Sequence, residues 1–153
     1  MTSLNNEATR AAFEAQTAEI EAEQKTRPLI SEIVELDSMI KEYDSTEAKG
    51  FQEQLKGLCE NYRIRRVRGD GNCFYRSFLF AYLDKLLAGL KDEGSKESAE
   101  KELERFKGVI SKSLQDLVDV GYDEFAVETF FDILTEMLEN LPSMSREALL
   151  DEF

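Results

Sequence analysis

A short segment near the middle of the chain combines a cysteine with residue types that activate a thiol. Residues 70–76 read Asp-Gly-Asn-Cys-Phe-Tyr-Arg, and Cys73 stands at the predicted start of a strongly apolar helix over residues 73–88. The unpaired amides and the positive dipole end of a helix N-terminus favour the thiolate, which is the nucleophilic form of cysteine. Glycines at 69 and 71 allow the backbone to turn so that N–H groups converge near the sulfur, as an oxyanion hole for acyl transfer requires. The segment therefore predicts nucleophilic thiol chemistry at Cys73.

The charges around this segment favour the same chemistry. Five arginines lie close to Cys73 in a chain that is otherwise acidic: Arg63, Arg65, Arg66, Arg68 and Arg76. Positive charge near a thiol favours its ionised form, so we expect their summed field to favour the thiolate further.

A structural role for Cys73 remains the alternative on position alone, because most intracellular cysteines are small buried hydrophobes. Cys59, which lies among apolar residues, is predicted to be such a core cysteine. The chain has no histidine, which excludes zinc sites that use imidazole and any Cys-His or Ser-His catalytic unit formed by this chain alone. Two cysteines are too few for a disulfide scaffold and are consistent with a reducing compartment. We expect no metal and no cofactor.

Composition indicates a globular protein without affinity for polyanions. The 153 residues are 42% hydrophobic and 33% charged, which suits one domain with an ordinary core. Acidic residues number 32 and basic residues 19, so the net charge of −13 disfavours binding to nucleic acid or to anionic membranes. No stretch approaches the ~18 uncharged apolar residues of a membrane helix. We expect a soluble cytoplasmic protein, with the nucleus as a further compartment, that binds neither nucleic acid nor membrane.

The spacing of apolar residues predicts a predominantly α-helical chain. Ahead of the cysteine segment we expect three helices, the first a helix over 5–25 with few apolar residues. The second has Leu29, Ile33, Leu36 and Ile40 on one face, and a turn at 44–46 follows it. The third has Phe51, Leu55, Leu58 and Tyr62 on one face, and an extended stretch over 62–68 comes after it. Residues 69–72 carry a strong turn signal. The apolar helix 73–88 must then be wrapped by other elements, because it has almost no polar face.

Beyond that helix, residues 89–101 are rich in Lys, Glu, Ser and Gly and predict a solvated linker or a frayed helix start. Three further helices are expected, over 103–117 with a stop near Gly121, over 127–141 with an end at Pro142, and from Ser145 to Phe153.

The segment 70–76, followed by Phe78, resembles the nucleophile motif of the ovarian-tumour (OTU) cysteine proteases, and within them it is most similar to the otubains. Further segments occur in the otubain order: Pro-Leu-Ile-Ser at 28–31, Lys-Glu-Tyr at 41–43, Leu-Glu-Arg-Phe-Lys at 103–107 and Gly-Tyr-Asp-Glu-Phe at 121–125. The resemblance runs from about residue 20 to the end, with an apparent insertion near 91–101.

The resemblance implies a papain-like α/β fold of which this chain is similar to the helical half, without the family's C-terminal β-sheet. It divides the chain into an N-terminal helical arm, 1–27, and an incomplete OTU domain, 28–153. It implies a ubiquitin-specific, thiol-dependent hydrolase in which Cys73 is the nucleophile and Asp70 is the motif aspartate whose loop helps to form the oxyanion hole. The family's general base is a histidine far downstream, so this isolated chain is expected to be inactive or nearly so.

Three hypotheses follow. The first is a truncated deubiquitinase that cleaves isopeptide bonds to ubiquitin or polyubiquitin, with exposed apolar surface and therefore self-association or dependence on a partner. The second is a non-catalytic protein that binds ubiquitin, or a ubiquitin-conjugating enzyme through residues 5–25. The third is a helical bundle with no connection to ubiquitin.

Overall fold

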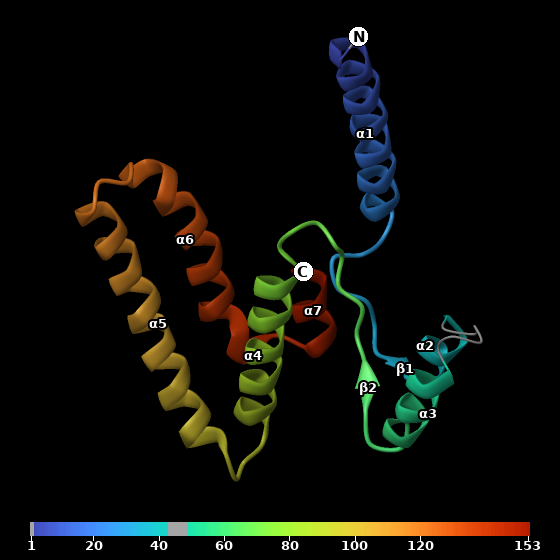
Figure 1. Ribbon diagram of the computed structural model, residues 1–153. Coiled ribbons are helices and arrows are strands. Elements are labelled where there is room, and N and C mark those ends of the chain that lie inside the picture. Colours follow the sequence, from blue (N-terminus) through green and yellow to red (C-terminus); the bar gives the residue numbers. More distant parts are fainter. Residues whose placement is uncertain (1, 43–48) are drawn as a thin grey trace. The chain divides into compact units, whose positions relative to one another are not determined.

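The computed structural model describes residues 2–42 and 49–153, so the turn predicted at 44–46 lies outside the described residues. The chain forms two compact units, residues 1–77 and 78–153. Figure 1 shows their elements, and helix α4 (Cys73–Lys91) contributes its first residues to one unit and the rest to the other. The division into an arm of 1–27 and a domain of 28–153 follows a different boundary and stays a prediction.

The first unit begins with helix α1 (Thr2–Lys25), which corresponds to the predicted helix over 5–25. The Thr26 hydroxyl donates to the Glu23 carbonyl oxygen at 2.7 Å at the end of the helix, and Pro28 cannot continue it because proline has no backbone N–H to donate. The exposed side chains of α1 include Phe13 and Ile20, which are 69% and 52% exposed. Phe13 and Ile20 therefore face solvent.

The helix predicted from Leu29 to Ile40 is wrong over most of its length. Residues 29–36 are not helical: strand β1 (Val34–Glu35) pairs antiparallel to strand β2 (Arg63–Ile64), and an isolated bridge joins Ile30 and Val67. The β-branched residues of this stretch favour extended backbone, and a partner strand satisfies its amides and carbonyls. Only α2 (Asp37–Glu42) is helical. The extended stretch predicted over 62–68 is confirmed by this pairing.

Helix α3 (Lys49–Leu58) completes the first unit, and it ends before Tyr62, which is 60% exposed and does not extend its apolar face. Among the residues of this unit whose burial is described, the buried apolar side chains are Ile30, Leu36 and Leu55. So small a core leaves most of the unit's order to backbone pairing and polar contacts.

The second unit is helical. After the remainder of α4 come α5 (Lys96–Asp119), α6 (Glu124–Asn140), the short 3₁₀ helix η2 (Leu141–Ser143) and α7 (Arg146–Asp151). Asp123 caps α6 by accepting a hydrogen bond from the Ala126 amide at 2.9 Å, and Ser145 caps α7 in the same way. The predicted helices of this half are thus confirmed, and so is the predominantly helical character of the chain.

The predicted solvated linker over 89–101 is wrong. Helix α4 continues to Lys91 and α5 begins at Lys96, so only residues 92–95 connect them. The charged residues occupy the exposed face of α5, where Lys101 bonds Glu97 at 2.6 Å across one turn. On the opposite face Ala99 and Leu103 are buried, and these two positions fix the side of α5 that packs.

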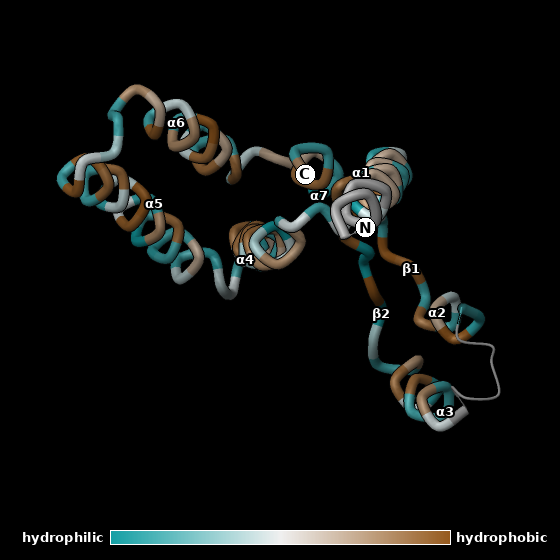
Figure 2. The backbone as a smooth tube through the Cα atoms, turned by 45° about the horizontal axis from the view of Figure 1, so that its top comes forward, coloured by the Kyte–Doolittle hydropathy of each residue, from teal (hydrophilic) through white to brown (hydrophobic). Residues whose placement is uncertain are grey.

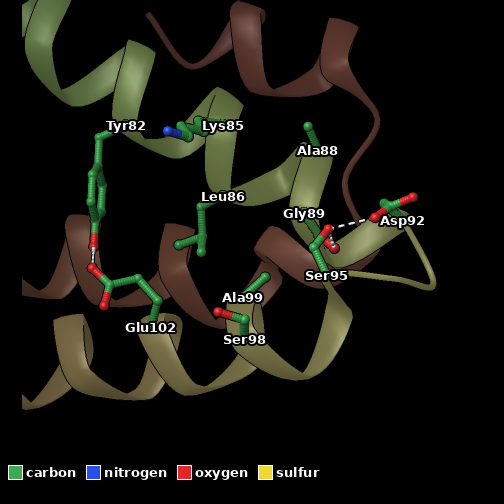
Figure 3. Close-up of a pocket in the computed structure, with 10 residues that line it drawn as sticks. All are labelled: Tyr82, Lys85, Leu86, Ala88, Gly89, Asp92, Ser95, Ser98, Ala99 and Glu102. Carbon is green, nitrogen blue, oxygen red and sulfur yellow. Dashed lines mark hydrogen bonds between the residues drawn. The ribbon is translucent and has the colours of Figure 1, made fainter.

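Helices α4 and α5 approach each other closely at the turn. A methyl group at Gly89 would lie 3.0 Å from the Ala99 Cβ, so glycine permits the approach. Farther along, Tyr82 donates a hydrogen bond to Glu102 at 2.6 Å and its ring meets Phe106 edge to face. Figure 3 shows the pocket of about 600 Å³ that these helices line, with Leu86 between the Tyr82–Glu102 and Ser95–Asp92 hydrogen bonds.

Only part of α4 is wrapped as the sequence predicts. Hydrophobic residues dominate the helix in Figure 2, and those that are buried belong to its last three turns: Phe80, Leu83, Leu86, Leu87 and Leu90. In its first two turns Phe74, Tyr75 and Phe78 are 65–72% exposed. Helix α4 is therefore anchored by its C-terminal half and presents apolar side chains to solvent beside Cys73.

Candidate active site

Cys73 is the first residue of α4, and its side chain is exposed. The preceding loop contains Gly71 at φ +89°, a left-handed conformation that side chains rarely adopt, so the turn depends on glycine. The predicted position of the sulfur, at a helix N-terminus after a glycine turn, is confirmed. The sulfur is neither inside the helix nor sealed among packed side chains.

Asp70 and Arg76 hold this loop against the first turn of α4. The two carboxylate oxygens of Asp70 accept hydrogen bonds from the Arg76 guanidinium at 3.0 and 2.8 Å, in a bidentate pair. One of these oxygens, Oδ1, also accepts from the Asn72 amide at 3.1 Å. Arg76 in addition donates to the Arg68 carbonyl oxygen at 3.4 Å. The loop therefore closes on its own helix through one carboxylate and one guanidinium.

These contacts determine the ionisation of Asp70. The hydrogen bonds from Arg76 hold the pKa of the Asp70 carboxyl below its ordinary value. Desolvation opposes them, and the bond from the Asn72 amide lowers the pKa by a smaller amount. Asp70 therefore stays ionised at neutral pH, with its oxygens hydrogen-bonded to Arg76 and the Asn72 amide, which makes it a poor proton acceptor for a thiol. The geometry gives Asp70 a role in shaping the loop.

The backbone amides of the loop divide into two groups. The Gly69 amide donates to the Gln24 side chain at 3.2 Å, and the Asn72 amide donates to Asp70. The amides of Gly71 and Cys73 donate to no acceptor within residues 2–42 and 49–153. These two amides are the donors that the loop leaves for an incoming carbonyl oxygen.

The arginines around the site are less available than their number in the sequence suggests. Four pair with carboxylates: Arg63 with Glu35, Arg65 with Glu32, Arg66 with Glu42 and Arg76 with Asp70. Arg68 donates to the Arg27 carbonyl oxygen at the C-terminal end of α1. Because most of their charge is offset locally, the summed field expected at the sulfur is weaker than the sequence suggested. The helix N-terminus remains the main source of positive potential.

Two contacts tie the loop to α1. Gln24 accepts from the Gly69 amide, and the Arg68 guanidinium donates to the carbonyl oxygens of Lys25, the last residue of α1, and of Arg27 just beyond it, where positive charge is favourable. The Gln24 contact could not be predicted, since a glutamine in a polar helix has no distinctive spacing. The contact of Arg76 with the loop could have been predicted, because its position three residues after Cys73 puts it on the first turn of the helix.

Cys59, the second thiol, is half-buried and bonded. Its Sγ donates to Asp37 Oδ1 at 3.2 Å and to the Leu55 carbonyl oxygen at 3.3 Å. Desolvation, followed by the hydrogen bond to Asp37, raises the pKa of this thiol. Cys59 is therefore the less reactive cysteine. Among the described residues no three acidic or cysteine side chains gather into a metal site, and no helix has the length and apolar character to cross a bilayer.

Comparison with known proteins places this arrangement in a family. The model of the peptidase C65 otubain family matches residues 22–152, which include the loop, Cys73 and the described helices that follow α1. The chain belongs to the otubain family. Ubiquitin thioesterase OTUB1 of Homo sapiens is 39% identical over 122 residues, and the ovarian tumor domain-containing deubiquitinating enzyme 1 of Arabidopsis thaliana is 34% identical over 139 residues.

These matches cover most of this otubain chain but less than half of its relatives. The shared part is 79% of this chain and 41% of human OTUB1, and 90% of this chain and 42% of the Arabidopsis enzyme. The chain thus spans about two-fifths of the length of these curated relatives.

Solved structures agree. A ceOTUB1 complex with ubiquitin aldehyde and UBC13~Ub has a TM-score of 0.73 and 32% identity, over 89% of this chain and 52% of that one. An h/ceOTUB1 complex with ubiquitin aldehyde and UBCH5B~Ub has a TM-score of 0.70 and 29% identity, over 92% of this chain and 54% of that one.

Proposed function

We propose that this chain is the nucleophile-bearing part of a ubiquitin thioesterase, and that Cys73 accepts the C-terminal acyl group of ubiquitin. The observation that carries the proposal is the exposed Cys73 on the first turn of α4, next to a loop that leaves the Gly71 and Cys73 amides without acceptors. Otubain relatives named ubiquitin thioesterases support the substrate class.

The chemistry is acyl transfer to sulfur. The Cys73 thiolate attacks the carbonyl carbon that joins ubiquitin to a lysine, a C–S bond forms, and the carbonyl oxygen becomes an oxyanion near the free amides. Collapse of this intermediate expels the lysine amine, which must gain a proton, and leaves an acyl-enzyme that water hydrolyses. Asp70 shapes the loop for this step.

General-base help is the part that these residues do not supply. The chain contains no histidine, and Asp70 is held ionised by Arg76. We therefore expect the 153-residue chain to react once with an activated ubiquitin and to turn over isopeptide bonds hardly at all, because amine departure and deacylation both need proton transfer.

Covalent labelling tests the proposal. The chain is incubated with ubiquitin that carries an electrophile at its C-terminus, and the adduct is located by peptide mass spectrometry. We expect one adduct, on Cys73, with Cys73→Ala abolishing it and Cys59→Ala leaving it intact. Labelling of neither cysteine, or of Cys59 instead, would refute the assignment.

A ubiquitin-conjugating-enzyme partner is the second candidate function. Two exposed apolar surfaces favour it: Phe13 and Ile20 on α1, within the predicted contact region 5–25, and Phe125, Phe130 and Ile133 on α6. The solved otubain neighbours are complexes that include UBC13~Ub or UBCH5B~Ub. Binding to such an enzyme that persists in Cys73→Ala, with no labelling of the parent chain, would favour a scaffold over a thioesterase.

We also propose a cytoplasmic location, with the nucleus as a further compartment. Both cysteines are free thiols, as a reducing compartment requires. Imaging of a fluorescently tagged chain at native expression would test it, and a secretory distribution would overturn it.

A further inference from the structure

We propose that Arg76 is a positioning residue for acyl transfer at Cys73: its bidentate bond to Asp70 holds the 69–72 loop so that the Gly71 and Cys73 amides stay free for the oxyanion. The inference deepens the proposed function and rests on it. It gives a part in the reaction to a side chain that touches neither substrate nor sulfur.

The first support is the way Arg76 connects the loop to the helix. Arg76 sits on the first turn of α4, three residues after Cys73, and bonds both oxygens of Asp70 at 3.0 and 2.8 Å. The same guanidinium donates to the Arg68 carbonyl oxygen. Arg76 therefore bonds residues at both the beginning and the middle of the 68–72 segment.

Burial distinguishes this pair from its neighbours. The side chains of Arg76 and Asp70 are 13% and 29% exposed. The Arg63–Glu35 and Arg66–Glu42 pairs of the same unit leave both partners more than 40% exposed, and in the Arg65–Glu32 pair the carboxylate is 76% exposed although Arg65 is 16% exposed. Exposed pairs contribute little because water competes with them, whereas a shielded bidentate pair keeps its geometry.

The third support is that the Arg76–Asp70 pair determines which backbone amides of the loop are hydrogen-bonded and which remain without an acceptor. With Asp70 held by Arg76, its Oδ1 takes the Asn72 amide at 3.1 Å. If Asp70 were released, its carboxylate could rotate and accept from other amides of the turn, including Gly71. Gly71 at φ +89° depends on the same turn, so loss of the guanidinium would relax the conformation that keeps the donors free.

Lysine cannot replace arginine here. A guanidinium offers parallel N–H donors that match both carboxylate oxygens, while an ammonium is a single point charge. Arg76→Lys therefore keeps the positive charge near Cys73 and removes the bidentate geometry. Arg63→Lys is the matched control, because Arg63 also pairs with a carboxylate in this unit but lies outside the loop.

The test separates oxyanion stabilisation from thiol reactivity. Ubiquitin aldehyde adds to the thiolate: a C–S bond forms, the C=O π bond opens, and the oxygen takes a proton from water to complete a hemithioacetal. Iodoacetamide alkylates the same sulfur with loss of iodide and forms no oxyanion. In a Cys59→Ala background, we expect Arg76→Lys to weaken the aldehyde adduct about 100-fold, as for loss of one oxyanion donor, with alkylation changed less than about threefold. Arg63→Lys should change neither.

A second readout does not need ubiquitin. The Asn72 amide is bonded to Asp70, so Arg76→Lys should speed its hydrogen exchange by about tenfold or more, measured by NMR, with Arg63→Lys unchanged. Should Arg76→Lys fail to fold, Asp70→Asn breaks the pair from the other side and should give the same losses. In the double variant the losses should not add, because both changes remove one interaction.

The outcomes distinguish the two proposals. Equal aldehyde affinity in the parent and Arg76→Lys, or unchanged exchange at Asn72, overturns the role of Arg76. A parent chain that is alkylated at Cys73 but forms no adduct with ubiquitin aldehyde refutes the proposed function instead. Alkylation and aldehyde addition that fall together in Arg76→Lys would also overturn the role, since they would show a general effect on the thiol.

Discussion

Replacement of Leu83 by alanine should destabilise the second unit severely, and replacement of Phe78 should not. Leu83 lies in the C-terminal half of α4 and has no exposed surface. Truncating a fully buried leucine removes its burial and leaves a cavity, at a cost of about 2–5 kcal/mol. For a unit of this size each kcal/mol lowers Tm by roughly 4–8 °C, so we expect a fall of about 10–40 °C or loss of folding. Phe78, five residues earlier in the same helix, is 65% exposed, and Phe78→Ala should cost less than about 1 kcal/mol.

Urea denaturation followed by circular dichroism at the helical band measures both variants against the parent chain. The contrast is the informative quantity, because the two residues share a helix and both replacements remove a large apolar side chain. Equal destabilisation by the two changes would refute the description of α4 as buried in its C-terminal half and solvent-exposed in its first two turns. A decrease of less than about 1 kcal/mol in the free energy of unfolding for Leu83→Ala would refute it as well.

Further predictions concern the second unit. Hydrogen bonds from Arg105, and then from Tyr82, lower the pKa of Glu102 from 4.5 to about 2, so its contribution to stability is complete above pH 4.5 and is lost as the pH falls toward 2. A carboxyl NMR titration should show this pKa, and Tyr82→Phe should raise it; an ordinary value in the parent would contradict the hydrogen-bond network. Gly121 has φ +99°, so Gly121→Ala should destabilise by about 1 kcal/mol. Gly108, inside α5 with open space around its Cα, should behave oppositely, with Gly108→Ala stabilising by about 0.5–1 kcal/mol in thermal melts; the same sign at both glycines would contradict this account.

The helices that could be predicted from sequence are those in which apolar residues recur at helical spacing and a breaker residue marks the end. Helix α6 follows from its apolar spacing and from Pro142 beyond its last residue. The stretch 29–36 could not, because its apolar spacing fits a helix equally well and only pairing with residues 63–67 decides for extended backbone. Residues 89–101 were wrongly predicted as a linker because their many charged residues indicate exposure to solvent. A helix also has a solvent-exposed face, and in α5 the charged residues lie on that face while Ala99 and Leu103 are buried on the other.

The candidate site was predictable in its position and less so in its electrostatics. A glycine turn before an apolar helix determines where Cys73 lies, since both features are local in sequence. The carboxylate that pairs with each arginine is not local in sequence, because Arg66 pairs with Glu42, 24 residues away, and Arg63 pairs with Glu35, 28 residues away. Such partners emerge only once the strands are paired.

Transfer of ubiquitin from a small-molecule thioester to this chain tests the central claim most directly. The Cys73 thiolate would displace the small thiol from the ubiquitin carbonyl, and the new thioester should persist because the chain has no histidine to assist its hydrolysis. We predict a ubiquitin adduct by intact mass that a thiol reductant removes, that maps to Cys73, and that is absent from Cys73→Ala. No adduct, or one carried by Cys59, would contradict the account.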